Sequence, residues 1–111
     1  MMGLNAFSKE ERIRRRADYL RIIREGKKSQ TEHFLVSFCP NLLPHCRLGI
    51  TVGKRVGPAV VRNRLKRRIR EFFRQNKILF PGATDCVVAA KVGAGNLTFW
   101  KMADELRGVL K

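Results

Sequence analysis

The segment from residue 54 to residue 74, KRVGPAVVRNRLKRRIREFFR, constrains the fold of this 111-residue chain more than any other part of the sequence. At about 100° per residue its apolar side chains fall within one arc of about 120°, which is typical of a helix with one buried face. Because such a stripe must be buried against another element, we expect a helix from residue 58 to about residue 77 that packs on a sheet. The stripe consists of Val61, Leu65, Ile69, Phe72 and Phe73.

The other sides of this helix carry a concentration of positive charge. Residues 54–74 contain nine of the 24 Lys and Arg residues of the chain and a single acid, Glu71. An ordinary solvated helix intersperses Glu with Lys, because like charges three or four residues apart repel each other. The guanidinium group of Arg also binds phosphate through paired hydrogen bonds. We therefore interpret the segment as a phosphate-binding surface rather than an ordinary exposed face.

The formal net charge of +15 points to a polyanionic partner, which is RNA, DNA or an anionic membrane surface. Apolar runs such as residues 86–90 fall far short of the roughly 20 residues that a membrane-spanning helix needs, so we expect no membrane partner. The N-terminus does not resemble a signal peptide. The three cysteines, Cys39, Cys46 and Cys86, form no C-x-x-C pair and fit a reducing compartment. We expect a cytoplasmic nucleic-acid-binding protein.

The remaining helices are predicted from apolar spacing and end signals. A first helix is expected over residues 16–25, ending at Gly26. Two alternatives stay open for residues 1–15. They can form a flexible N-terminal arm, or the first helix can start earlier, because Ser8 and Glu11 form a capping box. A last helix begins after Thr98, a plausible N-cap, and carries apolar residues on one face.

Three segments have the pattern of strands. In residues 33–39 two sets of side chains alternate and predict a half-buried strand with a solvated second face. The buried set is Phe34, Val36 and Phe38, and the set on the second face is His33, Leu35 and Ser37. Further strands are expected over residues 47–52 and 85–91, the latter central, and residues 27–31 can add a short edge strand. The order helix, two or three strands, helix, strand, helix predicts an α+β fold that forms a single small domain over residues 1–111.

Catalytic and metal-binding residues are not expected in the protein. His33, Cys39, His45 and Cys46 lie close in sequence but lack the ligand spacing of a structural zinc site. The nine acids are scattered, and adjacent acids diverge on a helix, so no carboxylate cluster of a metal-dependent nuclease emerges. A helix-turn-helix DNA binder is disfavoured, because a strand rather than a second helix precedes the basic helix.

The turn before the basic helix adds to its charge. Gly53 and Gly57 flank Lys54 and Arg55, and Pro58 suits the first turn of a helix. Backbone N–H groups and the positive end of the helix dipole attract phosphate at such a position. The spacing of the glycines matches neither a P-loop nor the GXXG loop of a KH domain.

The run RNRLKRRIRE, preceded by VGKRVGPAVV, resembles the signature of the bacterial ribonuclease P protein subunit. The resemblance extends over nearly the whole chain, through ADYLRIIREG, RLGITVGKRVG and LTFWKMADEL. It implies a four-stranded sheet in which the basic helix crosses between two parallel strands in a left-handed sense, an exception to the usual hand. It also implies an accessory protein of a catalytic RNA that removes the 5′ leader of precursor tRNA. Catalysis then belongs to the RNA and to Mg²⁺, bound mainly by the RNA subunit.

The resemblance assigns two groups of residues. A leader-binding cleft is implied at Tyr19, Ile23 and Ser37, although Ile23 and Ser37 stand where the family often has aromatic residues, which puts base stacking there in doubt. Without the resemblance, the position of Tyr19 on an amphipathic helix favours a core residue, and with the resemblance the core and cleft interpretations are equally open. The RNA-facing basic motif falls on Lys54, Arg55, Arg62, Asn63, Arg64, Lys66, Arg67 and Arg70.

The implied partners are the catalytic RNA subunit of ribonuclease P and precursor tRNA, with no small-molecule substrate. Composition does not separate this function from that of a ribosomal or other structural RNA-binding protein with no role in cleavage, because both are small and basic. Only the motif favours ribonuclease P.

Overall fold

The computed structural model describes residues 9–110, which form three α-helices and a four-stranded mixed sheet. The sheet order is β1-β2-β4-β3. The first three strands in this order pair antiparallel, and β3 pairs parallel with β4. The predicted α+β class is confirmed. In chain order the elements are α1 (Arg16–Glu25), β1 (Lys27–Gln30), β2 (Phe34–Pro40), β3 (Arg47–Thr51), α2 (Ala59–Gln75), β4 (Thr84–Ala90) and α3 (Phe99–Leu110).

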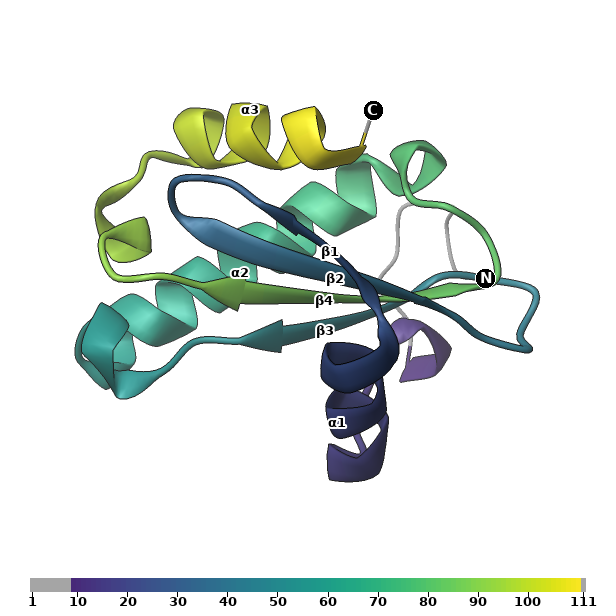
Figure 1. The fold of residues 1–111 in the computed structure, drawn as a ribbon. Coiled ribbons are helices and arrows are strands. Elements are labelled where there is room, and N and C mark those ends of the chain that lie inside the picture. Colours follow the sequence, from purple (N-terminus) through teal and green to yellow (C-terminus); the bar gives the residue numbers. More distant parts are fainter. Residues whose placement is uncertain (1–8, 111) are drawn as a thin grey trace.

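Helix α2 connects the parallel strands β3 and β4, as the resemblance implied, while the left hand of this crossover stays a prediction. Strand β4 is central, as its continuous apolar sequence predicted, and β3 lies at one edge of the sheet. Figure 1 shows α2 and α3 on one side of the sheet and α1 on the other.

The larger core lies between the sheet and the α2–α3 layer. Leu65, Ile69, Phe72 and Phe73 of α2 are all buried, so the predicted phase of this helix is confirmed. They pack against strand residues such as Val36 and Val88 and against Met102 and Leu106 of α3. Residue Thr98 accepts a hydrogen bond from the Lys101 N–H at 3.2 Å, consistent with its predicted N-cap role.

A smaller core lies under α1 on the opposite face and consists of Ile13, Ile22, Cys39 and Val87 with the partly buried Tyr19. Its presence corrects the prediction of a half-buried strand: Ser37 is only 3% exposed, although it lies on the face predicted to be solvated. The alternation indicated one buried face, but α1 covers the second, so both faces of β2 are shielded.

The segment before α1 packs on the exposed edge of β3. Ile13 is buried, and its N–H donates to the Leu48 carbonyl at 3.0 Å. Arg12 and Ile13 therefore contact the sheet in this structure. The α-helix begins at Arg16, and within residues 9–15 a short 3₁₀ helix precedes it at Lys9–Glu11. Ser8 of the predicted capping box and the arm over residues 1–8 lie outside the described residues.

Candidate RNA-binding surface

The exposed side of α2 and its entry turn carry cations without intramolecular partners. Lys54, Arg55, Lys66, Arg67 and Arg70 form no ion pair or side-chain hydrogen bond with another described residue. The single acid of the helix, Glu71, is occupied: hydrogen bonds from Arg74 hold the pKa of Glu71 below its ordinary value. The positive charge of this surface is therefore available to an external anion.

Three other arginines of α2 are tied to backbone carbonyls. Arg62 Nε donates to the Gly57 oxygen at 3.1 Å. Arg64 Nη2 donates to the Gly95 oxygen at 3.1 Å, and Arg68 Nη1 donates to the Leu97 oxygen at 2.8 Å. These bonds hold the entry turn and the loop before α3 against the helix. Arg62 and Arg64 of the predicted motif thus combine positive charge with a structural contact.

The entry turn forms as a 3₁₀ helix at Lys54–Val56, and Lys54 and Arg55 are exposed on it. Pro58 stands just before the helix rather than within its first turn. The first turn of α2 contains no acid, and no side chain caps it. The positive end of the helix dipole therefore adds to the two cations, as expected for a phosphate-binding position.

Tyr19 has a structural role at the edge of the sheet. Its hydroxyl donates to the Ile13 carbonyl and accepts from the Ile50 N–H, both at 3.2 Å. The ring lies against Gly49, where an added Cβ would come within 2.7 Å of Tyr19 Cε1. A side chain at position 49 would therefore displace the Tyr19 ring, which lies at the edge of β3 and is only partly buried.

The structure brings together two of the three residues assigned to the leader cleft. Tyr19 and Ile23 line an open hollow of about 390 Å³ beside Thr51 of β3. Ile23 is 43% exposed and adds apolar surface to it. Ser37 does not line this hollow and is buried in the sheet.

Sequence reasoning missed the arginines that precede and begin α1. Arg14 and Arg16 line the hollow with Tyr19, and Arg12 and Arg14 line a neighbouring hollow that also includes Arg70 of α2. The basic surface therefore continues from α2 around the edge of β3 to α1. The signal was the run RIRRR at residues 12–16, but its position relative to α2 depends on the packing of Ile13 on β3.

No helix in the described part of the chain is both long enough and apolar enough to cross a membrane.

Comparison with known proteins identifies the family of this chain. The family model for ribonuclease P matches residues 7–111. The ribonuclease P protein component of Syntrophus aciditrophicus is 51% identical, over 92% of this chain and 85% of that protein.

Two solved structures share the fold. The ribonuclease P protein of Thermotoga maritima is 41% identical, with a TM-score of 0.83 over 91% of this chain and 96% of that one. The Staphylococcus aureus protein is 39% identical, with a TM-score of 0.84 over 90% of this chain and 92% of that one. Because the family model and these relatives span nearly the whole chain, including α2 and its entry turn, this protein belongs to the ribonuclease P protein family.

Proposed function

We propose that this protein is the accessory subunit of ribonuclease P, which binds the catalytic RNA subunit and the single-stranded 5′ leader of precursor tRNA and assists removal of that leader. The observation that carries the proposal is the exposed side of α2, where Lys66, Arg67 and Arg70 have no partner among the described residues. Composition alone left a ribosomal protein equally open, whereas the family membership favours ribonuclease P.

The basic motif serves the contact with the RNA subunit. Its unpaired cations neutralise phosphates and release condensed counterions, which supplies most of the affinity and makes it salt-dependent. Asn63 is exposed between them and offers both a donor and an acceptor to sugar or base edges. Lys54 and Arg55 extend the contact to the N-terminal end of α2.

The hollow beside α1 serves the leader. Tyr19 offers the exposed part of its ring to a base, and Ile23 offers apolar contact. Ser37 is buried in the sheet, so in this arrangement it supports the strand rather than contacting the leader. The leader is thereby held by stacking and apolar contact, while the RNA subunit is held by charge.

Catalysis is assigned to the RNA subunit together with Mg²⁺, which that RNA mainly binds. Within residues 9–110, His, Cys, Asp and Glu side chains do not gather in groups of three or more that suit a metal ion. Buried Asp85 is surrounded by guanidinium and amide donors rather than by other carboxylates, so its setting suits a structural ion pair. The proposed setting is the cytoplasm, where precursor tRNA is available.

Reconstitution tests the proposal. We expect the protein to lower the concentration of Mg²⁺ or of precursor tRNA that a bacterial ribonuclease P RNA needs for leader removal, measured by cleavage of end-labelled precursor tRNA. A protein that binds this RNA no more tightly than an unrelated structured RNA, and leaves its cleavage unchanged, would instead act as a structural RNA-binding protein.

Replacement of Tyr19 separates leader binding from packing. Stacking on one base contributes about 1 to 3 kcal/mol, so Tyr19→Ala should selectively weaken binding of precursor tRNA by the assembled enzyme. Tyr19→Phe keeps the ring and removes only the hydroxyl bonds to Ile13 and Ile50, so it should retain leader binding at some cost in stability. Affinities for precursor and mature tRNA, with thermal unfolding of each variant, provide the measurement. Equal weakening of both tRNAs by Tyr19→Ala would assign the residue to the core alone.

A further inference from the structure

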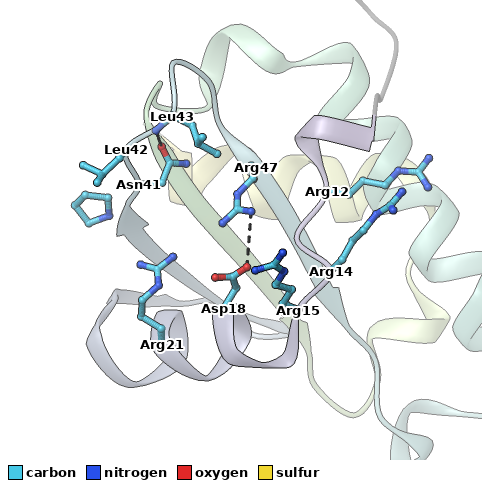
Figure 2. Close-up of a pocket in the computed structure, with 10 residues that line it drawn as sticks. Arg12, Arg14, Arg15, Asp18, Arg21, Asn41, Leu42, Leu43 and Arg47 are labelled. Atoms are coloured by element: carbon cyan, nitrogen blue, oxygen red, sulfur yellow. Dashed lines mark hydrogen bonds and ion pairs between the residues drawn. The ribbon is translucent and has the colours of Figure 1, made fainter.

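A further basic hollow lies on another face of α1, between this helix and the loop after β2. It has a volume of about 640 Å³ and is open to solvent. Figure 2 shows it, with Arg47 and Asp18 near the centre, Leu42 and Leu43 on one side, and Arg12 and Arg14 on the opposite side. Five arginines line it, namely Arg12, Arg14, Arg15, Arg21 and Arg47.

Two of these arginines are held from beneath by a buried carboxylate. Arg47 binds Asp85 through Nε at 2.8 Å and Nη2 at 2.6 Å, and Arg21 Nη2 binds Asp85 Oδ2 at 2.7 Å. The Asn41 amide donates to the same carboxylate at 2.8 Å. Asp85 is fully buried, so it is inaccessible to a ligand itself but fixes the direction of both guanidinium groups. A rigid pair of guanidinium groups is better suited to an anion than flexible surface side chains.

Two further arginines of the hollow bring charge that no carboxylate in the described part of the chain neutralises. Arg14 and Arg15 are exposed and pair with no carboxylate among the described residues. The only acid on the wall of the hollow is Asp18, whose Oδ2 lies 3.8 Å from Arg47 Nη1, beyond hydrogen-bond distance. With Asp18 and Asp85 counted against Arg21 and Arg47, the positive charges of Arg14 and Arg15 remain in excess.

The hollow is separate from α2 but continuous with its basic surface. Arg12 and Arg14 line both this hollow and the one that includes Arg70. An RNA strand bound on α2 therefore meets an uninterrupted line of arginines around the edge of β3. Leu42, fully exposed at the rim, adds apolar surface of the kind that a ribose or base covers.

We propose that this arginine hollow binds a backbone phosphate of RNA and is a third RNA contact, in addition to α2 and the hollow at Tyr19. Asp85 occupies the Nε and Nη2 edge of Arg47 and so orients this guanidinium, whose Nη1 has no hydrogen bond to another described residue. Arg15 at the start of α1 supplies a second, unpaired guanidinium to the same hollow. Charge-assisted hydrogen bonds from paired guanidinium groups are the strongest that proteins offer to phosphate. The inference rests on the proposed function for the identity of the RNA, which is the RNA subunit or precursor tRNA.

Arg15→Glu is the variant that tests the hollow. Arg15 precedes α1 and its side chain makes no capping hydrogen bond, and an acid at a helix N-terminus is favourable, so the fold is expected to be retained. The matched control is Lys101→Glu, which makes the same change of charge in the first turn of α3 at an exposed position outside the hollow. Circular dichroism and thermal unfolding verify that both variants fold.

Two affinities are measured for each variant over a range of salt concentrations, that of the free protein for the RNA subunit and that of the assembled enzyme for precursor tRNA. Loss of one phosphate contact should reduce the salt slope by about one and the affinity by about tenfold more in Arg15→Glu than in Lys101→Glu. If the loss appears in assembly, the phosphate belongs to the RNA subunit. If assembly is unchanged and precursor tRNA binds more weakly, the phosphate belongs to the substrate.

Equal affinities for Arg15→Glu and Lys101→Glu in both measurements would overturn the proposal. Failure of the proposed function is a different result, because the wild-type protein itself would then show no preference for either RNA.

Discussion

An Arg67→Ala/Arg70→Ala double variant is expected to bind the RNA subunit at least about a hundredfold more weakly than wild type, because hydrogen bonds to charged groups contribute about 1.5 to 3 kcal/mol each. Both residues lie on α2 away from its apolar stripe, and neither has a partner among the described residues. Their removal therefore costs RNA contacts and no intramolecular ion pair. Filter binding or fluorescence anisotropy at several salt concentrations measures the effect.

Salt dependence identifies the origin of this loss. Each phosphate contact removed should lower the slope of log affinity against log salt by about 0.7 to 0.9, so the double variant should lose nearly two units. An Arg24→Ala/Lys101→Ala variant removes the same charge from exposed positions outside α2 and should leave the slope near that of wild type. Equal slopes for the two double variants would show that only net charge matters and that α2 is not the contact.

Replacement of Asp85 is expected to have the largest effect on stability. Removing one partner of a buried ion pair costs about 3 to 5 kcal/mol, because the opposite charge is left without compensation. Asp85→Asn leaves Arg21 and Arg47 without their carboxylate and also disturbs the bond from Asn41. Urea unfolding at neutral pH should show a loss of this size, which is a large share of the total stability of a small domain. Asp104→Asn, at an exposed pair with Arg107, should change stability by less than about 1 kcal/mol.

The effect of Asp85 should also depend on pH. Burial by itself raises the pKa of Asp85, but hydrogen bonds from Arg47, Asn41 and Arg21 outweigh it and hold the pKa below the ordinary value of 3.8. A carboxyl with a lowered pKa in the folded state stabilises the protein above its unfolded pKa, and this contribution is lost as the pH falls through the folded pKa. The difference in unfolding free energy between wild type and Asp85→Asn should therefore be constant near neutral pH and shrink below about pH 4. A difference that is the same at acid and neutral pH would mean that Asp85 does not act through its charge.

Local patterns in the sequence were sufficient for most of the elements and for the basic helix. The spacing of Leu65, Ile69 and Phe72 set the buried face of α2, because a helix of 17 residues repeats its pattern over several turns. Because Arg67 and Arg70 fall outside this buried face, the same spacing placed them on the sides of α2 that do not face the core. The apolar run around Val87 likewise indicated a central strand. Each of these predictions concerns one helix or strand, because the periodicity of apolar residues reports on one element at a time.

The burial of Ser37 and the hollows beside α1 were decided only by the tertiary structure. Ser37 is buried because α1 crosses its face of the sheet, and no local pattern in β2 records that helix. The arginine hollow unites Arg15, Arg21 and Arg47 over Asp85, a residue 38 positions after Arg47 and 64 after Arg21. Residues so distant in sequence meet only when strands pair and helices pack. The sequence by itself therefore determined which side chains each element carries, whereas the tertiary structure determined which of them share a site, because long-range packing depends on the whole core at once.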